Sequence, residues 1–139
     1  MTNRVFVDSN VWVYLFSGED EIKKRKAQQF LSNGPIKTLL ISYQVMNEVS
    51  NTLKRKRYSE KQIRHVIRTL SRICTVHDFT KKTALLASHI REHHSFSFWD
   101  SQLLACAITA QCDLLISEDM QDGFALNGTT IKDIFKECE

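Results

Sequence analysis

Short apolar runs alternate along this chain with longer stretches in which apolar residues recur every three or four positions. The short runs are rich in β-branched and aromatic residues, which is typical of buried strands. The longer stretches have the period of helices with one apolar face. Strands are therefore predicted at Arg4–Asp8, Thr38–Ser42, Thr75–His77 and Leu114–Ser117, and Thr130–Ile134 is either a last strand or the start of a terminal helix.

Capping residues mark the helices between these strands. Six helices are predicted: from Ser9 or Asn10 through Phe16, over Glu21–Leu31, from Ser42 to about Lys54, from the Ser59–Gln62 capping box to about Ile73, from Thr80 to about His93, and over Phe98–Ala110. Strands that alternate with helices indicate an α/β fold with a mostly parallel central sheet flanked by helices. With no repeat or linker in the pattern, we expect a single domain over residues 1–139.

Composition narrows the class further. Hydrophobic residues make up 42% and charged residues 25%, which excludes a disordered chain, and Gly 4 and Pro 1 are few for an all-β fold. Residues 1–4 do not have the layout of a signal peptide, and no apolar run approaches the ~20 residues that span a membrane. The four cysteines contain no C-x-x-C pair. We therefore expect reduced thiols, a cytoplasmic location and no membrane partner.

Charge is distributed unevenly along the chain. Residues 1–50 carry a net charge of +1, residues 51–94 carry +8 and residues 95–139 carry −6, within a formal total of +3. Such an asymmetry is typical of a basic surface that attracts a polyanion beside a separate acidic feature, although two solvated faces of opposite sign would produce it as well.

Four carboxylates stand where the predicted elements bring them together. Asp8 and Asp119 each follow a strand, and the carboxyl ends of parallel strands share one edge of a sheet. Asp100 heads the inward stripe of its helix, and Glu48 borders the apolar face of the helix after the second strand. Each of the four has an ordinary alternative as a turn, cap or solvated residue. Together on one edge they would repel one another without a cation, and oxygen ligands alone suit Mg²⁺, with Mn²⁺ as a substitute, better than Zn²⁺.

Four ordered motifs carry a resemblance to a known family. The segments Val5–Val11, Val45–Val49, Phe98–Ala105 and Leu115–Asp119 resemble the motifs of PIN domains, and most of all those of VapC-type toxin ribonucleases. Asp8, Glu48, Asp100 and Asp119 match the four acidic positions of the family, and Asn10 matches its polar residue. The resemblance implies a PIN-like fold, an endoribonuclease that depends on Mg²⁺, a homodimer, and inhibition by a small antitoxin protein in a hetero-oligomer.

The resemblance also implies a role for each residue of the site. Asp8 and Asp100 are expected to be the main metal ligands, with Glu48 completing the site and orienting or deprotonating a water, and Asp119 holding a water-bridged or second metal. Asp119 is preferred to Glu118 because it stands two residues after Ser117, where the family has its last acid. The residues expected to support these ligands are Ser9, Asn10, Ser117 and Asp122. The resemblance also implies products with 5′-phosphate and 3′-hydroxyl ends, because a metal-activated water, and not the ribose 2′-hydroxyl, attacks.

Basic residues outside the acidic site are candidates for contact with the RNA substrate. Arg64, Arg68 and Arg72 form one stripe along a predicted helix, and Lys54 and Arg55 precede it. A solvated helix face and an antitoxin-docking face remain alternatives. Among the aromatic residues, Phe96, Phe98 and Trp99 are expected to pack in the core, and Trp12 in the core or a dimer interface.

Other functions fit the acidic residues less well. A phosphoacceptor receiver domain needs an acidic pair after its first strand and a Lys after its last, and this sequence has neither. A haloacid-dehalogenase-like phosphatase needs a second Asp where Asn10 stands. The remaining alternative is a catalytically silent PIN-like module that binds RNA or a partner protein.

Overall fold

Six strands form one sheet in the computed structural model, which describes residues 3–35 and 37–136. In chain order the elements are β1 (Asn3–Val7), α1 (Ser9–Ser17), α2 (Glu21–Ser32), β2 (Lys37–Ser42), α3 (Tyr43–Arg55), α4 (Glu60–Ile73), β3 (Thr75–His77), α5 (Lys81–His93), α6 (Phe98–Thr109), β4 (Leu114–Ile116), β5 (Ala125–Leu126) and β6 (Thr129–Lys132). The strand order is β3-β2-β1-β4-β6-β5, and every pair is parallel except β5 with β6. The predicted single α/β domain with a mostly parallel central sheet is confirmed.

The predicted elements are present, with three differences. The first helix is capped by Asp8, whose side chain accepts from the Ser9 amide, and not by Ser9 or Asn10. The segment around residue 130 forms strand β6 and not a terminal helix. The sequence analysis did not predict β5, which pairs with β6 through a two-residue turn at Asn127 and Gly128. Both turn residues have positive φ, 47° and 88°, which suits Asn-Gly in a tight hairpin.

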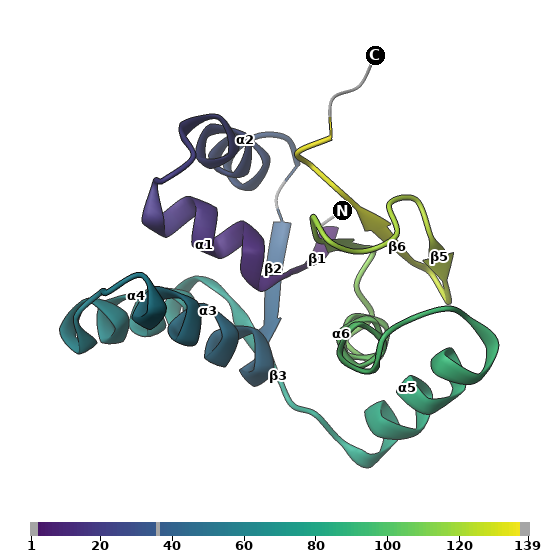
Figure 1. Ribbon diagram of the computed structural model, residues 1–139. Coiled ribbons are helices and arrows are strands. Elements are labelled where there is room, and N and C mark those ends of the chain that lie inside the picture. The colour runs from purple at the N-terminus through teal and green to yellow at the C-terminus, as the bar shows by residue number, and fades with distance from the viewer. Residues whose placement is uncertain (1–2, 36, 137–139) are drawn as a thin grey trace.

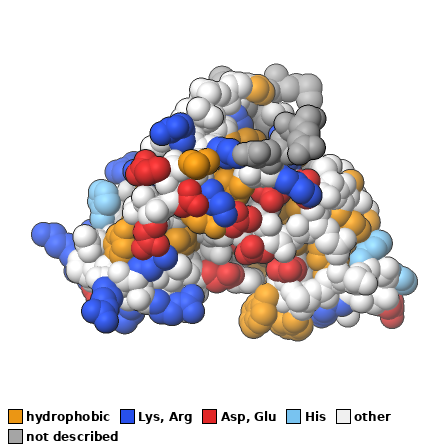
Figure 2. All heavy atoms as spheres, turned by 45° about the horizontal axis from the view of Figure 1, so that its top comes forward, with side chains coloured by type: hydrophobic (Ala, Val, Ile, Leu, Met, Phe, Trp, Pro, Cys, Tyr) orange, Lys and Arg blue, Asp and Glu red, His pale blue; other side chains and the backbone are white. Residues whose placement is uncertain are grey.

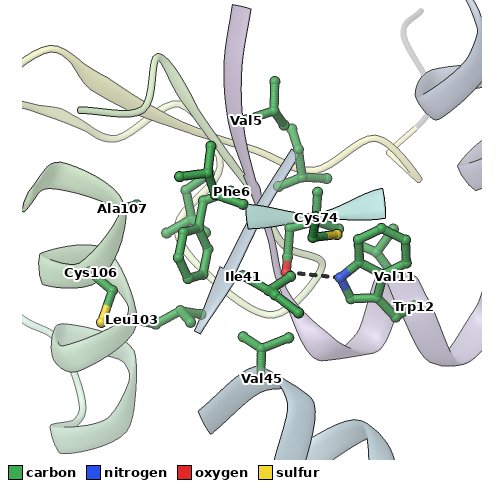
Figure 3. Close-up of a cluster of buried hydrophobic side chains, with 14 of the residues drawn as sticks. Val5, Phe6, Val11, Trp12, Ile41, Val45, Cys74, Leu103, Cys106 and Ala107 are labelled. Atoms are coloured by element: carbon green, nitrogen blue, oxygen red, sulfur yellow. Dashed lines mark hydrogen bonds between the residues drawn. The ribbon is translucent and has the colours of Figure 1, made fainter. Parts of the chain in front are cut away.

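Helices cover the sheet on both sides. Figure 1 shows α1, α2, α3 and α4 on one side of the sheet, and α5 and α6 on the other. Fully buried side chains fill both interfaces: Phe6 points from β1 toward α6, and Trp12 of α1 packs on the other side (Figure 3). The indole nitrogen of Trp12 donates to the Val7 carbonyl at 3.2 Å, so its one polar group is satisfied in the core. Of the two places predicted for Trp12, the structure therefore selects the core.

Two further predictions bear on the class of protein. Cys74, Cys106 and Cys112 are buried free thiols, as expected, and burial raises the pKa of each to about 11 or 12, whereas Cys138 lies outside the described residues. Among the helices of the described part, none combines the length and apolar character needed to cross a membrane.

Candidate active site

The strand order reverses its direction next to β1. The chain builds β1, β2 and β3 outward on one side, and β4 then returns to pair with the other side of β1. A parallel sheet leaves a crevice at such a reversal, outside the carboxyl ends of the strands. Asp8 and Ser117 directly follow β1 and β4, and the register Val7 to Ile116 sets them side by side. A carboxylate and a hydroxyl therefore meet at this edge of the sheet.

Asp8 is the most enclosed carboxylate of the site, with only 7% of its surface exposed. Its Oδ2 accepts from Ser117 Oγ at 2.7 Å, and its Oδ1 accepts from the Ser9 amide at 2.6 Å. The Asp8 amide donates to the Ile116 carbonyl at 2.9 Å, which ties the residue to β4 as well. These contacts hold the carboxylate in one orientation at the head of α1.

Glu48 reaches the same edge from α3. The hydroxyl of Ser9 lies 3.3 Å from both Asp8 Oδ1 and Glu48 Oε2, so it can donate to either carboxylate. Gln44, one helical turn before Glu48, donates to Glu48 Oε1 at 2.9 Å. The sequence analysis did not identify Gln44, although its spacing of four residues on the same helix is a readable signal.

Asp119 and Asp100 complete the group. Asn10 donates its amide Nδ2 to Asp119 Oδ2 at 3.1 Å, and the Asp119 amide donates to Ser117 Oγ at 3.3 Å. Asp100 stands in the first turn of α6, which is capped by Ser97. The residues of the predicted apolar stripe follow it along the helix and are buried or partly buried. Asp100 and Asp119 line one cavity of about 220 Å³. We refer to Asp8, Glu48, Asp100 and Asp119 as the acid cluster.

The pKa values show that these carboxylates act on one another. Burial raises the pKa of Asp8 from 3.8 to about 6, the nearby charge of Glu48 adds to the rise, and the hydrogen bonds from Ser117 and Ser9 oppose it. Burial also raises the pKa of Asp100, with the charge of Asp119 acting in the same direction and Ser97 opposing. Like charges are therefore held close together in two pairs.

The side chains of the acid cluster have the chemistry of a divalent-cation site, although within the described residues no three of them bring carboxylate oxygens within 4.8 Å of one another. In residues 3–35 and 37–136, no Lys or Arg forms an ion pair with any carboxylate of the acid cluster. A buried carboxylate without a counter-charge is costly, and the side-chain atoms that the acid cluster offers to a metal are all carboxylate oxygens. That donor set matches Mg²⁺ or Mn²⁺, and the absence of His and Cys from the cluster disfavours Zn²⁺. Figure 2 shows Asp and Glu side chains gathered in the middle of one face, with many Lys and Arg side chains on the side of α3 and α4.

Two acidic residues near the last motif lie outside the acid cluster. Glu118 accepts from Tyr14 at 2.6 Å and forms an ion pair with Lys23. Asp122 was expected to support the ligands, but its carboxylate accepts from the Asp133 amide at 2.9 Å and faces Lys136 at 3.8 Å. These contacts hold the segment after β6 and do not reach the acid cluster.

An aromatic groove of about 770 Å³ opens beside Glu48. It is lined by Tyr43 and Asn47 of α3, by Phe79, and by Trp99 and Gln102 of α6. The prediction that Phe98 and Trp99 pack in the core is wrong, because 52% and 63% of their surfaces are exposed. They stand in the first turn of α6, before the helix enters the core.

Phe96 behaves as predicted in part, since it is half-buried against Phe124 with ring centroids 5.0 Å apart. The predicted RNA-contacting residues lie on the surface away from the sheet. Arg64, Arg68 and Arg72 are exposed along α4, which packs against α3.

Comparison with known proteins shows which family this chain matches and which solved structures it resembles. A family model described as PIN domain matches residues 5–125. The sequence has no significant match among curated proteins. A toxin–antitoxin complex from Klebsiella pneumoniae is similar in structure, with a TM-score of 0.71, 23% identity, and coverage of 91% of this chain and 95% of that chain.

Two other solved structures are similar as well. VapC20 of Mycobacterium tuberculosis, described as a sarcin-ricin loop cleaving toxin, has a TM-score of 0.64 and 21% identity, covering 80% of this chain and 86% of that one. VapBC-1 of nontypeable Haemophilus influenzae has a TM-score of 0.65 and 16% identity, covering 96% and 99%. At these identities the likeness establishes the fold.

Proposed function

Because the chain belongs to the PIN domain family, we propose that it is a metal-dependent endoribonuclease and the toxin of a toxin–antitoxin pair. The convergence of four carboxylates at the reversal of the strand order carries this proposal. No cation of the described chain neutralises them, so the cluster is built to bind one from solution. The toxin–antitoxin structures among the neighbours support the biological context.

Each residue of the acid cluster has a task in phosphodiester hydrolysis. Asp8 and Asp100 would bind Mg²⁺ directly, with Asp119 held by Asn10 for a second or water-bridged contact. Bound there, Mg²⁺ supplies charge neutralisation at the phosphate and a more acidic water. Ser117 and Ser9 hold Asp8 in one orientation, so that its carboxylate need not search other rotamers before it binds a metal.

Glu48 is placed to orient or deprotonate the attacking water. Its side chain is exposed, and its two oxygens are held by Gln44 and Ser9. The water oxygen bonds to phosphorus as the bond to the 3′-oxygen breaks, and the leaving oxygen takes up a proton. The products then carry a 5′-phosphate and a 3′-hydroxyl.

Cleavage of RNA by the purified chain, with Mg²⁺ and with a chelator, tests the proposal. Asp100→Asn should lower the rate by about a hundredfold or more, because a lost metal ligand removes several kcal/mol of charge stabilisation. The matched control is Asp113→Asn at the opposite edge of the sheet, where the Asp113 carboxylate accepts from the Arg4 amide. RNA binding without cleavage in either Mg²⁺ or Mn²⁺ would instead favour the catalytically silent module.

The aromatic groove is where we propose that the antitoxin binds. Exposed Tyr43, Phe79 and Trp99 offer apolar area that water solvates poorly, and Glu48 lies in the groove wall. A polypeptide seated there would cover one side of the acid cluster and so restrict access of RNA. Trp99→Ala should therefore weaken inhibition by the antitoxin while cleavage by the free toxin persists. Homodimerisation and a cytoplasmic location stay predictions, and sedimentation of the free chain measures the first.

A further inference from the structure

A second group of metal-binding side chains lies outside the acid cluster, on the exposed side of α5. His89 and His93 are one helical turn apart, with parallel rings (4° between planes) and centroids 6.4 Å apart. Glu92 lies beside them, with its Oε1 3.2 Å from His93 Nε2. One ligand atom from each of the three lies within 4.8 Å of the other two. Figure 2 shows histidine side chains on the side of the molecule where α5 lies.

The chemistry of this group differs from that of the acid cluster. Two imidazole nitrogens and one carboxylate oxygen are the donor set of borderline metals such as Zn²⁺, and Mg²⁺ is a poor match for them. Tetrahedral Zn²⁺ needs its ligand atoms roughly 3.3 Å apart, given metal–nitrogen distances of about 2.0 Å. All three side chains are exposed, so rotamer changes alone can bring them to that spacing without moving the backbone.

We propose that His89, Glu92 and His93 form a binding site for a divalent cation of the Zn²⁺ class, with its remaining positions filled by water. The site is independent of the proposed ribonuclease function, since it shares no residue with the acid cluster. Its cation would bridge side chains across the last turn of α5, where a positive charge is also favoured by the helix dipole. The site would therefore stabilise the end of this helix.

That turn of α5 holds the beginning of α6. Arg91, between the proposed ligands in sequence, donates to Ser101 Oγ at 2.7 Å. Its guanidinium also lies 4.6 Å from the ring centroid of Phe98. Fraying of the last turn of α5 would break both contacts of Arg91. A cation that stabilises this turn is therefore expected to raise the melting temperature of the whole protein.

Titration of the full chain with Zn²⁺ by calorimetry, in excess Mg²⁺, tests the site. Changing His89→Ala or His93→Ala should each weaken Zn²⁺ binding by at least about tenfold, the smallest loss usual even for residues that only support a metal ligand. The matched control is His65→Ala, which removes an exposed histidine from α4. Imidazole NMR signals give a second readout: those of His89 and His93 should shift with Zn²⁺, and that of His65 should not.

The double variant His89→Ala, His93→Ala decides the proposal. Its melting temperature should no longer rise with Zn²⁺, whereas that of the wild type should. Because both side chains are exposed, the variant is expected to keep the native circular dichroism. Unchanged Zn²⁺ affinity and thermal shift in this variant would overturn the site. So would binding that survives in it and disappears in Asp100→Asn, because the cation would then lie in the acid cluster.

Discussion

Removing the charge of Asp8 is expected to make the metal-free protein more stable at neutral pH while it destroys the proposed cation site. Asn has nearly the same shape as Asp and caps helices as well. In Asp8→Asn the side-chain oxygen can still accept from the Ser9 amide, and the side-chain NH2 can donate to the Ser117 hydroxyl once that hydroxyl turns its hydrogen away, so neither a cavity nor a lost cap offsets the gain. The variant thus separates the cost of the buried charge from the packing around it.

The magnitude follows from the pKa of Asp8, which burial raises from 3.8 to about 6. A tenfold change in proton affinity is worth about 1.4 kcal/mol, so the charged carboxylate costs the native state roughly 3 kcal/mol at most. The native state binds the proton more tightly than the unfolded chain does. The free energy of unfolding of the wild type therefore falls as the pH rises from about 4 to about 6. That of Asp8→Asn does not fall in this way, because the variant has no carboxylate to ionise at this position. We expect a gain of about 1 to 3 kcal/mol above pH 6 and almost none near pH 4.

Urea denaturation in a chelator, at about pH 4 and about pH 7.5, measures both parts of this expectation. Saturating Mg²⁺ should narrow or reverse the difference in unfolding free energy between the variant and the wild type at neutral pH, because only the wild type is stabilised by binding the cation. The exposed Asp113→Asn is the control, with little change expected at either pH. A metal-free Asp8→Asn that is less stable than the wild type at neutral pH would refute the reasoning, as would a difference independent of pH.

Three other outcomes are expected. Mg²⁺ or Mn²⁺ should raise the melting temperature of the wild type by binding only the native acid cluster, and an unmoved thermal transition at saturating metal would contradict a shared site. Changing Leu104→Ala, in the fully buried part of α6, should cost about 2 to 5 kcal/mol of unfolding free energy in urea denaturation, because it opens a cavity. Neutralising Arg64, Arg68 and Arg72 together should flatten the plot of log RNA affinity against log salt by up to about two units, at ~0.7 per phosphate contact, and cleavage at saturating RNA should persist. An unchanged slope would leave these arginines to solvent or to a protein partner.

The fold was predictable because the periodicity and the capping residues agree with each other along most of the chain. The capping box at Ser59 and Gln62 is formed as predicted, and so is the cap at Thr80. What the pattern did not reveal was β5, because two residues carry no period. The Asn127-Gly128 pair was the available signal, since such a pair favours a tight hairpin turn.

The candidate site was predictable in its main residues because strand ends fix their position. Asp8 and Ser117 follow neighbouring parallel strands, so the sheet itself brings them into contact. The exposure of individual side chains to solvent was harder to infer from the sequence. Trp99 is apolar and begins a helix that is mostly buried, yet its place in the first turn leaves it in solvent. The contacts of Asp122 were equally hard to infer, because its carboxylate accepts from the backbone amide of Asp133 in a surface segment.

Two hydrogen bonds of the candidate site, from Ser117 to Asp8 and from Asn10 to Asp119, each join residues 109 positions apart. A ribosome adds roughly 5–20 residues per second, and a domain folds as a unit. The growing chain therefore carries Asp8 and Glu48 for several seconds before β4 and Asp119 exist. The proposed ribonuclease site cannot be completed before β4 and the residues after it have been made and paired with β1, so the topology itself postpones that activity until most of residues 1–119 have been translated.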